Sequence, residues 1–221
     1  MKYVLLYLIC CAGCLSCRSE QEPAMLFPSA EWERSVPAGA GIEEDKMLEA
    51  LDYLRSKSFE DGIEEVLIIK NGRIVYQGDS TYNAHNIYSC SKVFTSTVLG
   101  LLLDRGRLAL DDKAADHDPA LREEYPAVTF RHFATMTSGY NAAGRSRWSD
   151  ENADWSWTPY SPEAPHFPPG THFEYWDEAQ MMYGRVLTKV LGEPMRDFLR
   201  RELTDKIGMG DWQWLPEQEV D

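Results

Sequence analysis

Ser89 and Lys92 are the two residues of this chain whose types and spacing most directly suggest chemistry. They stand three positions apart at the start of an apolar helical run, which places both side chains on one helical face about one turn apart. If the surroundings dehydrate Lys92, its neutral amine can take the proton from Ser89 Oγ and leave a nucleophile. The alternative is that Ser89 only caps the helix and Lys92 lies on a solvated face. Because S-x-x-K is short enough to occur by chance, the surrounding sequence has to decide.

An apolar helix has to hold this pair. The stretch after Lys92 predicts a helix that stops at Gly106 and is buried nearly all round, so that its first turn is held rigidly. The free N–H groups and the positive dipole end at its N-terminus favour negative charge that develops near Ser89. The apolar residues of this stretch are Val93, Phe94, Val98, Leu99, Leu101, Leu102 and Leu103.

The segment before Ser89 predicts a helix and then a hairpin. Apolar residues at helical spacing indicate an amphipathic helix over 43–56. Two apolar runs, 66–70 and 73–77, flank Asn71-Gly72, a preferred residue pair for a type I′ turn. A helix, two antiparallel strands and then the Ser89 helix indicate a sheet with helices packed on it.

The segment after Gly106 predicts more helices. We expect a short helix over 128–136, in which His132 fixes the helix start rather than binding a ligand. Two further helices are expected, over 178–191 and about 195–207. Between the helix over 128–136 and the helix over 178–191, residues 145–160 lack a period and contain Trp148, Trp155 and Trp157, which indicates a long loop. Whether that loop walls a pocket or packs as a lid over a core stays open.

The charge balance narrows the class of protein. The 221 residues contain 22 Lys and Arg against 36 Asp and Glu, a net charge of −14. No basic cluster is present to neutralise phosphates, which argues against a nucleic-acid partner. The five histidines form no array with metal-ligand spacing, so we expect no metal site. The length is sufficient for one domain or two small ones.

Residues 1–17 predict a secretory signal rather than part of the fold. Lys2 precedes an apolar stretch over 3–11 that is too short to span a membrane. Ala12-Gly13-Cys14 is similar to the end of a lipobox, although Cys11 stands where leucine is usual. Membrane attachment through a lipidated Cys14 and plain secretion both stay open, and either outcome gives a secreted or periplasmic protein.

After the signal, residues 18–40 predict a tether with no sustained period. Four of the five cysteines lie within the signal region, so the mature chain keeps essentially one cysteine available to the fold, Cys90. We expect Cys90 to be of the buried type, and we expect no disulfide framework.

Taken together, several ordered motifs resemble the serine β-lactamase and penicillin-binding-protein superfamily. Among its branches, the resemblance is strongest to the class C β-lactamase-related group, which includes esterases, D-amino-acid peptidases and 6-aminohexanoate-dimer hydrolase-like proteins. The resemblance implies an α/β (α+β), β-lactamase/transpeptidase-like fold with an N-terminal helix, a β-hairpin and a helical region, in a domain over 41–221. The matching segments are the Asn71-Gly72 hairpin, 88–96, 106–112, 128–132, 135–140, 169–175 and 207–209.

The resemblance also implies a mechanism. Ser89 would attack a carbonyl and form an acyl-enzyme that water then releases, and Lys92 would share the work of the general base. Tyr175 stands where the family has the tyrosine of its Tyr-x-Asn element. Its phenol, with a pKa lowered by the neighbouring cation, would relay the proton from Ser89 to the leaving group. No cofactor is implied, and the substrate would be an ester, an amide, a β-lactam or a peptide.

Asp177 departs from the asparagine of the family pattern, and Trp176 stands between it and Tyr175. By position, Asp177 and Trp176 would contact the substrate. A carboxylate can only accept hydrogen bonds, so Asp177 would pair with Lys92 and keep it protonated. It would also repel anionic substrates, which makes ester or amide hydrolysis a better prediction than penicillin hydrolysis.

The third element of the family, a Lys-Thr-Gly or His-x-Gly type strand, does not follow Asp177. We therefore expect a partial domain that lacks its C-terminal sheet strands, a hairpin with an exposed apolar side, and low or no turnover from these residues alone. Two hypotheses follow. One is a serine hydrolase impaired by truncation; the other is a catalytically inactive secreted or lipoprotein binding protein, or a gene fragment.

Overall fold

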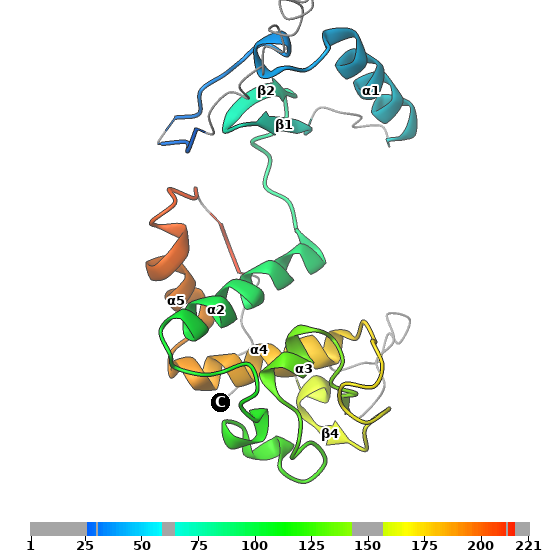
Figure 1. The fold of residues 1–221 in the computed structure, drawn as a ribbon, viewed down its shortest axis with the longest axis vertical. Helices are drawn as coiled ribbons and strands as arrows, with labels where there is room; N and C mark the ends of the chain where they lie inside the picture. Colours follow the sequence, from blue (N-terminus) through cyan, green and yellow to red (C-terminus); the bar gives the residue numbers. More distant parts are fainter. Residues whose placement is uncertain (1–25, 30, 59–64, 143–156, 211, 215–221) are drawn as a thin grey trace, which may run out of the picture. The chain divides into compact units, whose positions relative to one another are not determined.

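The computed structural model describes residues 26–29, 31–58, 65–142, 157–210 and 212–214. The chain divides into two units, Met1–His85 and Asn86–Asp221. The expected mixture of helices and strands is confirmed (Figure 1). The helices are α1 (Glu44–Lys57), α2 (Lys92–Asp104), α3 (Phe130–Ala134), α4 (Asp177–Leu191) and α5 (Met195–Leu199). The strands are β1 (Leu67–Lys70), β2 (Arg73–Gln77), β3 (Asn141–Ala142) and β4 (Pro162–Glu163).

The first unit contains the predicted helix and hairpin. Strands β1 and β2 pair antiparallel, with a bulge between Ile68 and Ile69. Asn71 (φ 52°) and Gly72 (φ 78°) both have positive φ at the turn. Two consecutive residues with positive φ are the requirement of a type I′ turn, and this explains the Asn-Gly pair. The expected exposed apolar side is also present, because Leu67 and Ile69 of β1 are both exposed.

The prediction of a tether over 18–40 is wrong for the described part of that range. Ile74 of β2 donates its N–H to Glu33 O (2.9 Å), and Ser35 N–H donates to Ile74 O (2.9 Å). Leu26 N–H reaches Asn71 O at the turn (3.0 Å). The free edge of β2 presents backbone donors and acceptors that need partners, and this segment supplies them.

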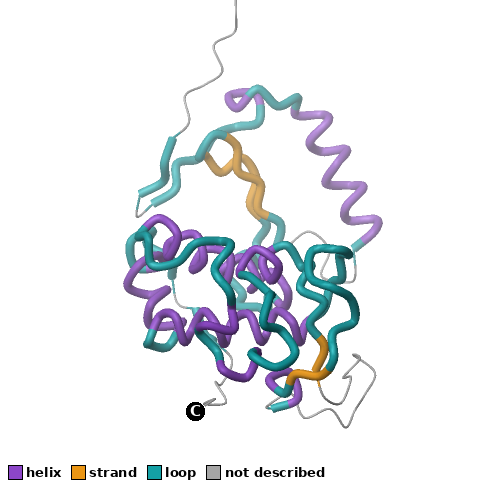
Figure 2. The backbone as a smooth tube through the Cα atoms, turned by 60° about the horizontal axis from the view of Figure 1, so that its bottom comes forward, coloured by secondary structure: helices purple, strands orange, loops and turns teal. Residues whose placement is uncertain are grey.

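The second unit is built mainly of helices and loops (Figure 2). Its α4 helix contacts α2, α3 and α5. Aromatic side chains fill its core. Phe133 of α3 stacks on Tyr183 of α4 with ring centroids 5.8 Å apart, and Tyr125 packs against Tyr140 at 5.0 Å. Strands β3 and β4 pair antiparallel beside these helices. Within the described residues, no helix is long and apolar enough to cross a membrane.

The helices predicted after Gly106 are confirmed with small shifts. The α4 helix starts one residue before the expected position, and α5 continues into a π-helical turn over Arg200–Thr204. The α3 helix begins after Thr129, whose hydroxyl accepts the His132 backbone N–H while His132 Nδ1 accepts the Thr129 N–H. This reciprocal cap confirms that His132 fixes a helix start.

The expectation that α2 is buried nearly all round is wrong. Its buried residues are Val98, Leu99 and Leu102, whereas Val93 is 59% exposed. The α2 helix contacts α4 and α5, and its buried residues lie in its second half, whereas Val93 in its first turn stays accessible. The expectation of a buried-type Cys90 is wrong for a related reason, because Cys90 lies in the exposed turn that precedes α2.

Candidate active site

Ser89 lies in a short 3₁₀ turn, Tyr88–Ser91, that leads directly into α2. Asn86 Oδ1 accepts the backbone N–H of Tyr88 at 3.0 Å, and Tyr88 has φ 44°. A non-glycine residue with positive φ is strained, and such residues concentrate at functional sites. No side-chain capping bond is formed at the start of the turn or of α2. The structure therefore does not support the alternative that Ser89 only caps the helix.

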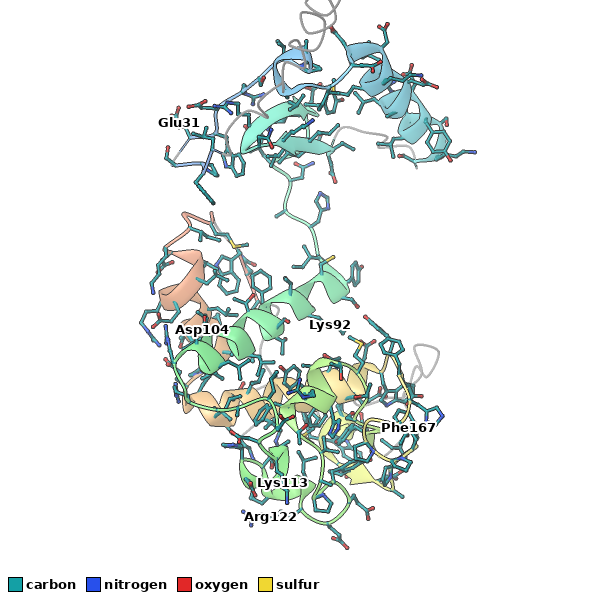
Figure 3. The ribbon with its side chains drawn as sticks, in the orientation of Figure 1. Glu31, Lys92, Asp104, Lys113, Arg122 and Phe167 are labelled. Atoms are coloured by element: carbon teal, nitrogen blue, oxygen red, sulfur yellow. The ribbon has the colours of Figure 1, made fainter. Side chains whose placement is uncertain are left out.

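Two side chains form hydrogen bonds with Ser89 Oγ. Lys92 Nζ donates to Ser89 Oγ at 3.1 Å, and the Tyr175 hydroxyl donates to the same oxygen at 2.7 Å. Lys92 Nζ also lies 5.0 Å from the centroid of the Tyr175 ring. Lys92 is labelled at the first turn of α2 in Figure 3. The structure thus brings together all three residues for which the sequence predicts catalytic roles.

The segment that carries Tyr175 is fixed by backbone hydrogen bonds to the turn after α3. These bonds join His166 N to Gly139 O (2.9 Å), Gly170 N to Thr137 O (2.8 Å) and Glu174 N to Met136 O (2.9 Å). Tyr175 itself is 47% exposed, so it is not a core aromatic residue. Its place near Ser89 therefore depends on the segment around it.

Asp177, the first residue of α4, forms the predicted pair with Lys92. Its Oδ1 accepts from Lys92 Nζ at 2.7 Å, with both side chains largely sheltered from solvent. Burial acts to lower the pKa of Lys92, but the hydrogen bonds with Asp177 and Tyr175 outweigh it, and the pKa is raised. In this arrangement Lys92 is therefore held as a cation rather than as the neutral amine that the motif first suggested.

Tyr175 shows the opposite shift. Its hydrogen bond with Ser89 and the nearby Lys92 ammonium lower the pKa of the phenol. Both interactions stabilise the phenolate relative to that of an ordinary tyrosine, the Ser89 contact when the serine hydroxyl donates to the phenolate oxygen. Of the two candidate bases, Tyr175 is therefore the one whose surroundings favour the proton-accepting form.

Trp176 lies against the hydrophobic core of the second unit. Its ring meets the His166 ring edge-to-face, with centroids 5.5 Å apart. Its Nε1 is buried and has no hydrogen-bond partner within the described part of the chain. The contacts of Trp176 are thus with the protein interior, and a substrate contact for it stays a prediction.

Trp148 and Trp155 of the predicted long loop lie outside the described residues, while Trp157 is exposed. The described ranges contain no group of three or more His, Cys, Asp or Glu side chains that could hold a metal ion. The contact between His166 and Glu174 was missed, because His166 lies outside the matching segments and the contact requires the loop to fold back.

The fold and these contacts define a class of protein. In this class a serine and a lysine lie one helical turn apart, and the serine contacts a tyrosine that precedes a second helix. The chain belongs to the beta-lactamase family, whose model matches residues 60–221. The resemblance on which the fold prediction rested is thereby confirmed. Over 159 residues the chain is 28% identical to a "Beta-lactamase" of Pseudomonas fluorescens, covering 65% of this chain and 43% of that protein. It is also 28% identical over 144 residues to "Penicillin-binding protein 4" of Amycolatopsis lactamdurans, covering 59% and 36%.

Solved structures show the same fold. A penicillin-binding protein homologue from Caulobacter crescentus matches with a TM-score of 0.57 and 22% identity, over 76% of this chain and 51% of that one. A D-alanine carboxypeptidase from Burkholderia cenocepacia matches with a TM-score of 0.54 and 21% identity, over 76% and 50%. The chain thus spans less than half the length of the two curated relatives and about half that of these structures.

Proposed function

We propose that this protein is a serine hydrolase that cleaves an ester or an amide through an acyl-enzyme on Ser89. The observation that carries the proposal is the convergence of Lys92 Nζ and the Tyr175 hydroxyl on Ser89 Oγ, at 3.1 and 2.7 Å. A nucleophile within hydrogen-bond reach of a base that is itself oriented by another group is the general signature of covalent catalysis. Family membership and the positive end of the helix dipole near Ser89 add support.

In the proposed acylation step, the phenolate form of Tyr175 takes the proton from the Ser89 hydroxyl. A bond forms between Ser89 Oγ and the carbonyl carbon, and the electron pair of the C=O bond moves to oxygen. The backbone N–H of Ser89 is assigned as one donor to that oxyanion. The bond to the leaving alkoxide or amine then breaks, and the leaving group takes the proton from Tyr175. Water repeats the sequence to release the acid and free Ser89.

Lys92 acts in this scheme as a fixed cation rather than as the base. Asp177 keeps it protonated, and its charge lowers the pKa of Tyr175. Because the Asp177 carboxylate neutralises the Lys92 charge, the pair presents no net positive charge to an incoming anion. We therefore propose neutral esters and amides as better substrates than penicillins, which carry a carboxylate.

The second candidate is a catalytically inactive binding protein, favoured by the raised pKa of Lys92. Labelling of the purified protein with a fluorophosphonate and, in parallel, a fluorescent penicillin separates the two. We expect fluorophosphonate labelling that Ser89→Ala abolishes and that Ser96→Ala, a control at an exposed position of α2, leaves unchanged. Peptide mass spectrometry should place the adduct on Ser89. A sample that is folded by circular dichroism and does not label would support the binding protein instead.

We also propose that the mature protein lies outside the cytoplasm, anchored through a lipidated Cys14 or secreted. The support is the pattern of Lys2, the apolar stretch over 3–11 and Ala12-Gly13-Cys14. These residues lie outside the described part of the structure. Metabolic labelling with radioactive palmitate, compared between the wild type and Cys14→Ala, tests the anchor. Incorporation lost in the variant would support lipidation, and fractionation of an unlabelled protein would distinguish secretion from retention in the cytoplasm.

A further inference from the structure

We propose that His166 is a positioning residue for Tyr175, because it holds the residues on both sides of that phenol. The inference rests on the proposed function, in which Tyr175 exchanges a proton with Ser89. His166 touches neither Ser89 nor a reacting atom in this arrangement, so its effect passes through Tyr175.

The contacts of His166 flank Tyr175 in the sequence. His166 Nδ1 lies 2.8 Å from Glu174 Oε2, with Glu174 immediately before Tyr175. The His166 ring packs edge-to-face against Trp176, immediately after Tyr175, at 5.5 Å between centroids. The two partners of the hydrogen bond are only 20% and 35% exposed, so solvent competes weakly for them. One imidazole thus fixes both neighbours of the phenol.

His166 is itself held by the backbone. Its N–H donates to Gly139 O at 2.9 Å, and Gly139 has φ 67°. A Cβ at Gly139 would lie 2.1 Å from Phe167 O, so only glycine permits this close approach. The backbone of 166–167 therefore lies directly on a rigid turn. The His166 side chain reaches from that turn to the segment that carries Tyr175.

Tyr175 needs such support because its own ring is 47% exposed and has little packing to orient it. The contact that matters is the 2.7 Å distance from its hydroxyl to Ser89 Oγ. A displacement of about 1 Å in a reacting group can cost about a hundredfold in rate. Loss of the His166–Glu174 bond should therefore reduce reactivity well before it unfolds the protein.

The experiment compares two matched pairs of variants in the full chain. Glu174→Leu removes the acceptor, whereas Glu174→Gln keeps an acceptor oxygen for His166 Nδ1–H. His166→Phe keeps a ring against Trp176 but loses the donor. His172→Phe is the same substitution on the same segment, at a residue whose recorded contacts are with Thr171 and Phe167. The readouts are the second-order rate constant of Ser89 labelling by a fluorophosphonate, the thermal midpoint, and the Tyr175 titration followed by the ¹³Cζ resonance.

We expect Glu174→Leu and His166→Phe to slow labelling by at least about tenfold while the thermal midpoint falls by less than about 2 °C. Glu174→Gln and His172→Phe should stay within about twofold of the wild type. The pKa of Tyr175 should rise toward its ordinary value in the first two variants only, because the displaced phenol loses its contacts with Ser89 and Lys92. Equal labelling rates in the two Glu174 variants would overturn the proposal.

The titration separates this proposal from the proposed function. If the folded wild type does not label at all, the proposed hydrolase is wrong, and the Tyr175 resonance alone decides the role of His166. A pKa that rises in Glu174→Leu and not in Glu174→Gln would still show that His166 positions Tyr175. An unchanged pKa in both would refute it.

Discussion

At the scale of single residues, the site is defined by opposite pKa shifts on neighbouring groups. The Lys92 ammonium and the Tyr175 phenol share the Ser89 oxygen, and the pKa of the first is raised while that of the second is lowered. Groups whose surroundings push their pKa values in different directions divide acid and base roles between them. Asp177 sets this division, because its carboxylate stabilises the charged form of Lys92.

Asp177→Asn tests that role. The carboxylate raises the pKa of Lys92, so its removal should lower that pKa and let Lys92 lose its proton at lower pH. In a plot of the Ser89 labelling rate against pH, the transition caused by deprotonation of Lys92 should therefore move to lower pH, by about one unit. Penicillin labelling should also rise relative to fluorophosphonate labelling, because the Lys92 charge is no longer neutralised. Asp104→Asn at the far end of α2 is the control, and a shift to higher pH would contradict the assignment.

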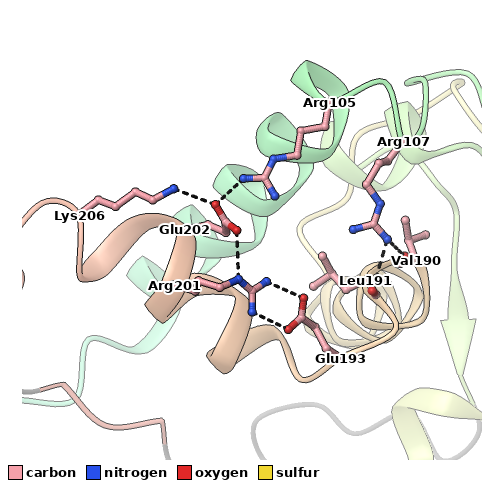
Figure 4. Close-up of polar contacts among 8 residues, drawn as sticks. All are labelled: Arg105, Arg107, Val190, Leu191, Glu193, Arg201, Glu202 and Lys206. Atoms are coloured by element: carbon pink, nitrogen blue, oxygen red, sulfur yellow. Dashed lines mark hydrogen bonds and ion pairs between the residues drawn. The ribbon is translucent and has the colours of Figure 1, made fainter.

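At the scale of elements, a charged network fastens the C-terminal end of α2 to the turn after α5 (Figure 4). Glu202 is its centre: Arg105, directly after α2, donates to it at 2.5 Å, Lys206 at 2.8 Å and Arg201 at 3.1 Å. Arg201 also donates two bonds to Glu193. Since α2 carries Lys92 at its other end, this network helps to hold the helix on which the site is built.

Glu202→Gln should destabilise the protein near neutral pH and not near pH 2. The three cations lower the pKa of Glu202 to about 2. A depressed pKa gives stability that is present above the ordinary value for glutamate, about 4.3, and is lost as the pH falls toward about 2. Urea unfolding at several pH values measures the difference between wild type and variant. A difference that persists near pH 2, or one matched by Glu123→Gln at an exposed position, would contradict the network's role.

At the scale of the whole molecule, a buried ion cluster ties the turn after α2 to the central helix. Asp118 is fully buried and accepts from Arg185 Nε (2.9 Å) and Lys189 Nζ (3.0 Å) of α4. Burial alone would raise the pKa of Asp118, but the Ala120 N–H and the two cations outweigh it, and the pKa is lowered. This cluster joins segments that are far apart in sequence, so the tertiary structure of the second unit depends on it.

Asp118→Ala should reduce the free energy of unfolding by about 3 kcal/mol, because it leaves two cations without their buried partner. Asp111→Ala is the matched comparison. It also removes an Asp–Arg pair, with Arg131, but both of those side chains are exposed, so we expect little change. Chemical denaturation of the two variants measures the contrast. Equal losses would mean that burial is not what gives the Asp118 cluster its strength.

The sequence by itself determined the features that depend on neighbouring residues. The Asn71-Gly72 turn, the cap at His132 and the boundaries of α4 follow from local backbone preferences and helical periodicity, and the structure confirms them. The spacing of Ser89 and Lys92 fixed their separation by one turn, since both lie on one short segment. The Asp177 pairing with Lys92 was also predictable, although only because the resemblance placed Tyr175 and its neighbours beside Ser89.

Only the tertiary structure decided what depends on segments that meet in space. Periodicity could not show that Val93 in the first turn of α2 stays exposed, because burial is set by the helices that reach it. It could not show that the backbone at Arg34 pairs with β2, because a free strand edge accepts any suitable backbone. The contacts of His166 with both neighbours of Tyr175 likewise depend on segments that meet only in the folded chain. They arise because a loop folds back on Gly139, and no local pattern records the distance between two side chains on such a loop.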